Sequence, residues 1–446
     1  MFPTSKFWRA ALLAALCSTV LYGEDRFEKS FSRTLTYRGG KVSVEHSFGG
    51  VTIDTQSGSE VSVRATIRSS DPEFGKQIQI IAVQEGSDIR VRTEYPERSM
   101  HGGNFSYSVD YKITVPANAP LLVRNRFGSI DARGIRASSE FINSMGSIDL
   151  SDAKGAQRLQ NSFGSVEITD SAGDMSVKNQ NGSIRAHEIS GRLDASNRFG
   201  SVDVEKARQV SVENTNGSVN VREVDGPLRI VSAFGSVVAS NVKGSADITN
   251  ANGRVEARNI GGNTELKTSF GSIAASDIRG NLTVTGQNSR VETHDVTGQA
   301  TISTTFGSVE VHNAGSVSVE NANGGVQIFD ITHDARVRTT FGSAFARGVG
   351  GAVDIQNQNG AIAVSGLSSA GCRPVTLRTS FSSIKVSVPA NASYAVNART
   401  SFGRINSDLP IMTRSAGDET LVGTIGGGAC RMDLSNANGS ITIEKE

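Results

Sequence analysis

A short phrase recurs along the chain at an almost constant interval, and this repeat constrains the fold more than any other feature. The phrase reads FGSV at Phe163, NGSI at Asn181 and FGSV again at Phe199, so Phe and Asn alternate every 18 residues. Two of the steps are 17 residues long, and the spacing loosens after Asn359. We call these positions the marks. The marks that we take as structural repeat anchors are Phe127, Phe163, Asn181, Phe199, Asn216, Phe234, Asn252, Phe270, Asn288, Phe306, Asn323, Phe341 and Asn359.

Between two marks, apolar and polar residues alternate in short runs. After Phe270, Ile273 and Ala275 alternate with polar neighbours, and a turn containing Gly precedes a second run with Leu282 and Val284. A period of two in short runs bounded by Gly and Asn is typical of β-strands. The apolar spacing of an amphipathic helix is not sustained in any stretch of the sequence.

Short strands at a fixed period stack into a β-solenoid, in which each coil bonds to the coils on either side. We therefore predict an all-β, right-handed parallel β-solenoid with about 18 residues per coil, the handedness resting on analogy. A 36-residue coil with separate Phe and Asn ladders is the alternative that the repeat leaves open. Since Phe306 has the parity of Ala300 and Ile302, we expect the Phe marks to point into the core. The Asn marks should bond to backbone at the corners.

The repeat divides the chain into four expected segments. Residues 1–23 have a positive start and a short apolar run, which is typical of a cleaved signal peptide and too short to span a bilayer. Residues 24–126 read as a β-rich N-terminal cap or first coils, 127–365 as regular solenoid repeats, and 366–446 as irregular C-terminal coils. We expect an exported chain, in the periplasm, on the outer surface or secreted, with no transmembrane segment after cleavage.

The mature chain would keep two cysteines, Cys372 and Cys430. In an exported protein such a pair invites a disulfide. In a regular stack the two would lie about three coils apart, or roughly 14 Å at ~4.8 Å per strand, which is too far for a bond. Because the region around them is irregular, the sequence leaves the disulfide open.

A longer phrase links the two ends of the repeat. ITVPANAPLLVRNRFGSI at 113–130 is echoed by VSVPANASYAVNARTSFGRI at 386–405. Together with the FGSV and NGSI phrases, this pattern resembles the bacterial putative-adhesin family of exported β-strand-repeat proteins, which is similar to head GIN-type adhesin domains. The resemblance covers most of residues 40–446. It implies a β-helical, non-enzymatic surface or periplasmic protein, and no functional residue carries over from it.

Composition and motifs offer no catalytic, cofactor-binding or metal-binding residues. The net charge of +1 argues against a nucleic-acid partner. The six His residues are scattered and lack the spacing of a zinc site. The calcium-binding nonapeptide, the P-loop, the GxSxG motif and the dinucleotide fingerprint do not occur. We therefore expect no cofactor and no enzymatic activity.

One outward column, four residues after each mark, is rich in acidic residues. It is either a solvated face that discourages edge pairing or a strip that binds cations, a basic partner or a glycan. Polysaccharide lyases and hydrolases on β-helices also use outward Asp and Arg, but they need clustered carboxylates in a cleft. The candidate strip consists of Asp131, Asp149, Glu167, Asp203, Glu256, Glu292 and Glu310.

These observations favour an exported, non-enzymatic binding or scaffold protein, an adhesin that acts through an extended β-solenoid surface. Its partner is then an unknown cell-surface glycan or protein, or a second copy of the chain. A carbohydrate-active β-helix enzyme is the second hypothesis, and a partner in envelope stress signalling is the third. Three or more carboxylates clustered with Arg in one groove would favour the enzyme, and flat polar faces would favour the binding protein.

Overall fold

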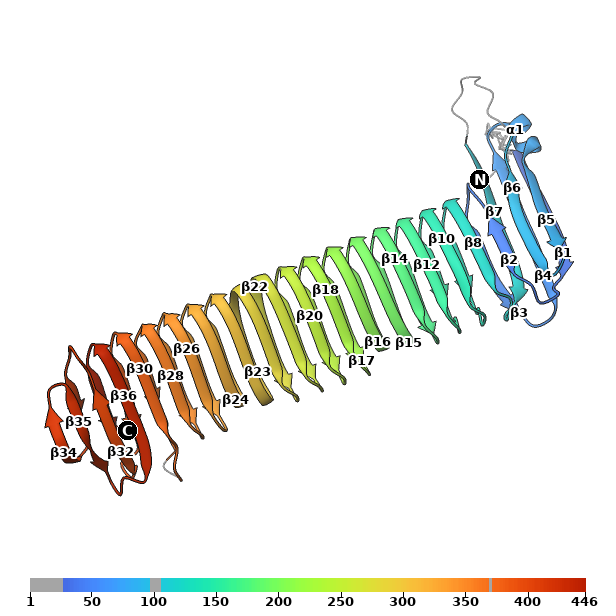
Figure 1. The fold of residues 1–446 in the computed structure, drawn as a ribbon. Coiled ribbons are helices and arrows are strands. Elements are labelled where there is room, and N and C mark those ends of the chain that lie inside the picture. The colour runs from blue at the N-terminus through green and yellow to red at the C-terminus, as the bar shows by residue number, and fades with distance from the viewer. Residues whose placement is uncertain (1–26, 97–105, 369–370) are drawn as a thin grey trace, which may run out of the picture.

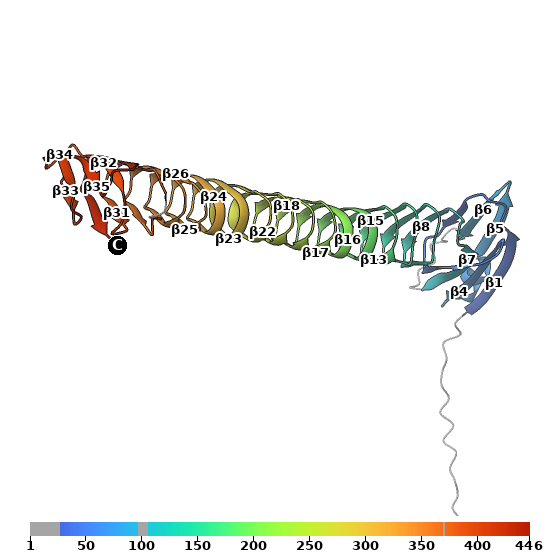
Figure 2. The same cartoon turned by 90° about the horizontal axis from the view of Figure 1, so that it is seen from below.

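The computed structural model describes residues 27–96, 106–368 and 371–446. The expected signal peptide, residues 1–23, lies outside the described residues. The described chain forms one sheet of 37 strands that winds along the molecule, with one short helix, α1 (Pro72–Gln77). Figure 1 shows a long rod that runs from the blue N-terminal end to the red C-terminal end, and Figure 2 shows its coils stacked one behind another.

Each coil of the rod contributes strands to two main rows. Strands of the first row end at a mark: β8 (Leu121–Phe127), β10 (Ser139–Met145), β12 (Gln157–Phe163), β14 (Met175–Asn181), β18 (Leu228–Phe234), β20 (Ala246–Asn252), β26 (Ala335–Phe341), β28 (Val353–Asn359) and β30 (Val375–Phe381). Strands of the second row begin three residues after a mark: β9 (Ile130–Arg133), β11 (Ile148–Ser151), β13 (Val166–Ser171), β17 (Val219–Val224), β19 (Val237–Val242), β21 (Val255–Ile260), β25 (Val326–Ile331), β27 (Ala344–Val349), β29 (Ile362–Ser365) and β31 (Ile384–Val388). Some strands continue around a corner and contribute to both rows: β15 (Ile184–Phe199), β16 (Val202–Asn216), β22 (Thr264–Ile278), β23 (Leu282–Phe306) and β24 (Val309–Asn323).

The register between coils confirms a parallel β-solenoid with 18 residues per coil. Met145 pairs with Phe163, Phe163 with Asn181, and Asn181 with Phe199, all between parallel strands. Phe and Asn therefore stack alternately on one edge of the rod, and the alternative of a 36-residue coil is excluded. About 15 coils follow one another in this way.

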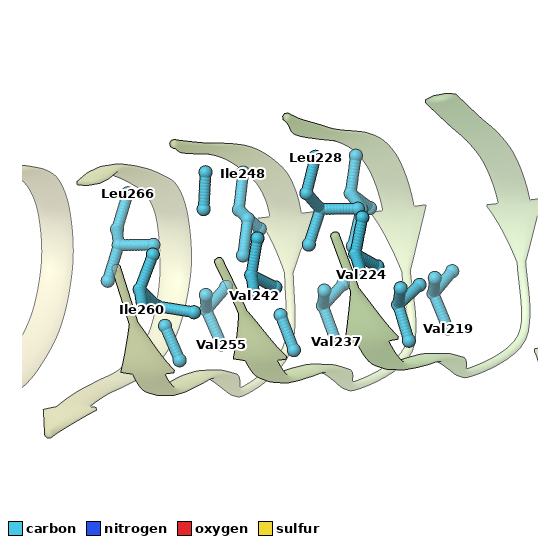
Figure 3. Packing of buried hydrophobic residues seen from close by; sticks show 14 of the residues in the cluster. Val219, Val224, Leu228, Val237, Val242, Ile248, Val255, Ile260 and Leu266 are labelled. Atoms are coloured by element: carbon cyan, nitrogen blue, oxygen red, sulfur yellow. The ribbon is translucent and has the colours of Figure 1, made fainter. Parts of the chain in front are cut away.

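Aliphatic side chains fill a narrow core inside the coils. Figure 3 shows them stacked from coil to coil, for example Val224, Val242 and Ile260, which are at most 1% exposed. Each such residue lies directly over its equivalents in the neighbouring coils, because the parallel register repeats at the same position. Burial of these continuous columns stabilises the stack, since a single coil cannot bury its own apolar face.

Both ends of the solenoid carry antiparallel strands. At the N-terminal end, β2 (Val42–Glu45) and β3 (Val51–Gln56) lie on the first regular coil, and β4 (Glu60–Ser69) pairs antiparallel with its neighbours. The other strands of this end are β1 (Phe27–Thr36), β5 (Gln79–Glu85), β6 (Asp88–Glu94) and β7 (Tyr107–Pro116). Antiparallel pairing covers the open edge that the last coil would otherwise present.

The C-terminal end explains how the two cysteines meet. The strands here are β32 (Tyr394–Arg399), β33 (Ile405–Ser407), β34 (Met412–Gly417), β35 (Thr420–Ile425), β36 (Cys430–Asn438) and β37 (Ile441–Lys445). Strand β36 returns to pair directly with β30, so Val375 lies beside Met432. Cys372 lies just before β30 and Cys430 is the first residue of β36, and the two form a disulfide with Cα atoms 5.0 Å apart. The expected three-coil separation fails because β32 to β35 form the outer end of the rod, beyond β36.

Within the described residues, no helix is both long and apolar enough to cross a membrane.

Candidate functional site

The Phe marks lie on the outside of the rod, so the expectation that they fill the core is wrong. Phe163, Phe199, Phe234, Phe270, Phe306, Phe341 and Phe381 are 45–57% exposed. The cause is a bend just before each mark. Asn161 is buried and pairs with Asn179 in the next coil, whereas Ser162 has no partner in the ladder and Phe163 pairs again at the corner. The parity of the strand therefore does not extend to the mark.

At many marks a buried Asn lies at this bend, two residues before the mark, whereas Ser or Thr takes that place before Phe234, Phe270, Phe306, Phe341 and Phe381. The side-chain Nδ2 of Asn161 donates to the carbonyl of Gly146 at 3.0 Å, and that of Asn179 donates to the carbonyl of Gly164 at 3.1 Å. These bonds satisfy corner carbonyls that would otherwise be buried without a partner. The signal in the sequence is the phrase N-x-F-G or N-x-N-G, whose first Asn was overlooked. The buried members are Asn125, Asn143, Asn161, Asn179, Asn197, Asn214, Asn250, Asn321, Asn357 and Asn436.

Most Asn marks donate from the side-chain amide to a backbone carbonyl of the preceding coil. Asn181 Nδ2 donates to the carbonyl of Ser162 at 3.3 Å, and Asn359 Nδ2 donates to the carbonyl of Thr340 at the same distance. The shorter Asn side chain thus lies against the backbone of the preceding coil. At every second coil, the edge of the rod therefore carries a low Asn between two protruding Phe rings.

The Gly that follows most marks permits the coils to approach. Gly164 has φ +122°, which L side chains rarely adopt. A Cβ at Gly164 would lie 2.7 Å from the carbonyl carbon of Gly146 and closer still to its oxygen. Both the backbone angle and the packing of neighbouring coils require Gly at this position.

The surroundings of the marks are almost uncharged. We define the aromatic stripe as the marks from 127 to 381, including Met145, together with the residue before and the two residues after each mark. Apart from the marks, most of its residues are Gly, Ser, Thr, Ala and Gln. In Figure 1 the stripe follows the edge of the rod at the arrowheads of β8, β10, β12 and their successors. The charged residues of the stripe are Arg126, Arg198, Arg254 and Arg290.

The acidic column predicted from the sequence exists as a stacked column but is not a continuous strip. Asp149 lies between Asp131 and Glu167 in register, and Glu292 lies beside Glu310. Between these two groups, Asp203 and Glu256 stand in register with residues of other types. The interrupting residues are Arg185, Asn220, Val238 and Ala274.

Most of these carboxylates already have partners within the chain. Asp149 accepts a hydrogen bond from Ser147 Oγ at 2.7 Å, and Asp203 accepts one from Ser201 Oγ at 3.1 Å. Burial raises the pKa of Asp131, and the negative charge of Asp149 adds to this rise. The remaining member in the middle of the rod, Glu256, is nearly buried and pairs with Arg254 and Arg258.

The second acidic group lies beside two stacked imidazoles. His312 Nε2 lies 2.9 Å from Glu310 Oε1, and this hydrogen bond lowers the pKa of Glu310. His294 Nε2 lies 3.3 Å from Glu292 Oε1, and the two imidazole rings stack with centroids 4.8 Å apart. Two of the six scattered His residues, His294 and His312, are thus brought together here. Even so, the described residues contain no group of three or more side chains that could hold a metal ion.

An open groove of about 1300 Å³ runs along another edge of the rod. Asp170 and Glu188, each seven residues after a mark, line this groove. Both have positive φ angles, 49° and 57° respectively. Lys206 Nζ lies 3.0 Å from Glu188 Oε1 and lowers the pKa of that carboxyl, whereas a hydrogen bond with Glu188 raises the pKa of Asp170. The other charged residues that line the groove are Arg208, Glu223, Asp225, Lys243 and Arg279. The sequence predictions do not include this groove, although Asp, Asn and Glu recur in its column.

Comparison with solved structures gives only weak likenesses. A putative cell adhesion protein from Clostridium sporogenes is 8% identical, and the alignment covers 94% of this chain and all of that one, with a TM-score of 0.17. A putative adhesin from Parabacteroides distasonis is 11% identical over 70% of this chain and 96% of that one, with a TM-score of 0.18. These superpositions are too poor to carry an argument.

The family comparison is more informative. No curated protein matches the chain. Residues 243–444 match the family described as Toastrack DUF4097, and the match covers the second half of the regular coils and the C-terminal end. This region contains the same alternating marks as the coils before it. The resemblance inferred from the repeat is therefore confirmed for residues 243–444, which are similar to the Toastrack DUF4097 family.

Proposed function

We propose that this chain is an exported, non-enzymatic binding or scaffold protein, adhesin-like in its action, that binds through the aromatic stripe. The row of half-exposed Phe marks carries this proposal. Contiguous apolar patches of more than a few hundred Å² on a soluble protein mark interaction sites. A rod with a stripe along most of its length offers a partner many equivalent contacts, each of them weak.

The disulfide supports export. Cys372 and Cys430 are bonded, and disulfides form and persist in oxidising compartments such as the periplasm and the cell surface. The bond also joins the return strand β36 to the main stack at β30. In an oxidising compartment this disulfide would stay formed and would hold the outer end of the rod to the main stack.

Display on a carrier bacterium tests the proposal. The measured quantities are the clumping of displaying cells and their capture of bare cells, together with binding of the purified mature chain to a glycan array. The variant replaces Phe234, Phe270 and Phe306 with Ser, and the control replaces Phe329 and Phe345, which lie off the stripe.

We expect at least a tenfold loss of clumping, capture or glycan binding in the triple variant and little change in the control. The proposal is wrong if the unaltered chain, displayed at normal level, neither clumps nor captures cells and binds no glycan. It is equally wrong if binding survives in the triple variant.

Cleavage of a polysaccharide is a second candidate function, and the open groove favours it. The groove combines several carboxylates with Arg208 and Arg279, which is the arrangement expected of a carbohydrate-active β-helix enzyme. The pKa values of Asp170 and Glu188 are shifted in opposite directions, as in an acid and base pair. Both carboxylates lie on the exposed surface, however, and Glu188 is already paired with Lys206.

Turnover distinguishes the two functions. The purified chain is incubated with any glycan that it binds, and new chain ends are measured in the unaltered protein, in D170N and E188Q, and in the control E167Q outside the groove. We expect no product from any of them. Product that disappears in D170N and E188Q, but not in E167Q, would establish the enzyme and remove the non-enzymatic proposal.

A further inference from the structure

We infer that the aromatic stripe is a self-association surface, on which a second copy of this chain packs antiparallel with its Phe rings over the Asn marks of the first. The inference deepens the proposed function and rests on it in one respect, because it names the partner of the same stripe. The occupant is a second copy, and four features of the stripe point to it: its profile, its charge, its area and its side-chain chemistry.

The profile of the stripe is complementary to itself. Phe and Asn alternate from coil to coil, so protruding rings stand about 9.6 Å apart, or two strand spacings, with a low Asn between them. When a copy is turned end to end and shifted by one coil, each ring enters the gap above an Asn of the other copy. Such a contact is isologous and closes as a dimer, because the same patch is used on both chains.

The residues beside the rings permit a close approach. Gly follows most marks, Ser follows that Gly in most coils, and the residue before the mark is mainly Ser, Thr, Ala or Gln. The two Arg residues in the middle of the stripe are already paired within the chain: Arg254 Nε lies 3.1 Å from Glu256 Oε2, and Arg290 Nη2 lies 3.7 Å from Glu310 Oε2. Of the four Arg residues in the stripe, Arg126 and Arg198 lie over the rings of Phe127 and Phe199, with Cζ 5.3 and 5.5 Å from the ring centroids.

The exposed area is sufficient for a stable dimer. A Phe side chain buries about 200 Å² when fully covered, so a half-exposed ring offers roughly 100 Å². Phe163, Phe199, Phe234, Phe270, Phe306, Phe341 and Phe381 are each about half exposed, and together offer roughly 700 Å² per chain, or about 1,400 Å² for the pair. Specific interfaces bury about 1,200–2,000 Å² in total, so the Phe rings alone reach this range without any contribution from the Ser and Asn residues of the stripe.

The chemistry of the marks favours a protein partner over a glycan. Phe has no polar handle, whereas Tyr and Trp combine an apolar face with a hydrogen-bonding group. Every exposed aromatic residue of the regular marks is Phe. A stripe with few charges, without Tyr or Trp and with a two-coil alternation matches its own copy more closely than a chain of sugar rings.

Sedimentation of the mature chain tests the inference. The molar mass is measured over a hundredfold range of concentration for the unaltered chain, for the triple variant F234S/F270S/F306S, and for the control F329S/F345S. Circular dichroism of each variant checks that the coils are folded. We expect a dimer for the unaltered chain and the control, and a monomer for the triple variant at the same concentrations.

A second variant separates a fitted contact from general stickiness. N252F/N288F fills two of the gaps while it adds apolar surface to the stripe. We expect at least tenfold weaker dimerisation, because the rings of the partner no longer find a gap. Stronger association in N252F/N288F would overturn the inference, as would a folded triple variant that remains dimeric or an unaltered chain that is monomeric throughout.

The two proposals fail in different ways. A chain that is monomeric in solution, but captures bare cells or binds a glycan through the Phe marks, overturns self-association and keeps the proposed binding function. A chain that dimerises through the stripe, but causes neither clumping nor capture when displayed, keeps self-association and removes the adhesin-like function.

Discussion

Replacement of Gly217 by Ala should weaken the stack by more than a strained backbone angle alone would. Gly217 has φ +126°, and a Cβ there would lie 2.6 Å from the carbonyl carbon of Gly200 in the preceding coil. An L residue at such an angle costs about 1–3 kcal/mol. Forcing a methyl group into packed backbone costs about 1–3 kcal/mol more. We therefore expect a loss of about 2–6 kcal/mol in the free energy of unfolding of the surrounding coils.

Gly58 provides a matched control. It has nearly the same angle, φ +128°, but nothing lies within 4 Å of the position that a Cβ would take. G58A should therefore show the cost of the angle alone, about 1–3 kcal/mol. The difference between the two variants isolates the steric cost of separating two coils.

Hydrogen exchange is the suitable assay, because a long repeat array need not unfold in one step. The amide of Gly200 donates to the carbonyl of Asn216 at 2.8 Å, and the amide of Gly217 donates to that of Phe234 at 3.0 Å. Both amides should exchange faster in G217A and remain protected in G58A. The reasoning is refuted if G217A is no more destabilised around residues 200–234 than G58A is around its own turn.

Three further outcomes are expected. F270S should change the free energy of unfolding by about 1 kcal/mol or less, because the ring is half exposed, whereas I230A should cost about 2–5 kcal/mol, because Ile230 is fully buried. Urea unfolding of the two variants measures both losses. Equal losses would place the Phe marks in the core after all. Burial lowers the pKa of His46 to about 4, so between about pH 6.5 and 4 its imidazole stays neutral in the folded cap but binds a proton in the unfolded chain. The cap should therefore lose about 3 kcal/mol of stability as the pH falls across this range. This loss, measured by hydrogen exchange of the cap, should vanish in H46F, and a cap that is equally stable at both pH values would contradict it. The disulfide closes a loop with a sequence separation of 58, so its reduction should destabilise the C-terminal end by about 4 kcal/mol and leave the middle coils unchanged. Hydrogen exchange of the β36 amides with and without reductant measures this loss. Unchanged exchange would show that packing alone holds β36 in place.

The architecture was accessible from the sequence because a strict period leaves few folds open. The distance from Phe163 to Asn181 is one coil, and the alternating residues after Phe270 are the strands β22 and β23. Both conclusions follow from one-dimensional periodicity, and neighbouring coils in a solenoid repeat the same environment.

The orientation of the marks was not accessible from parity, because parity holds only within a straight strand. Asn161 bends the chain at the corner, and Phe163 therefore turns outward although Leu159 points inward. The disulfide could not be settled from the sequence for a topological reason, since β36 returns to β30 after an excursion through β32 to β35. The charged groove could not be predicted, because the sequence period does not show which outward columns lie side by side. That arrangement is set by the cross-section of the coil.

Footprinting of the aromatic residues tests the central claim most directly. Hydroxyl radicals oxidise exposed rings, and mass spectrometry reports the oxidation of each Phe in the free chain and in the chain bound to its partner. The account predicts that Phe234, Phe270 and Phe306 become protected on binding, while Phe329 and Phe345 do not. A bound chain in which the Phe marks remain as reactive as in the free chain would contradict the claim that the aromatic stripe is the binding surface.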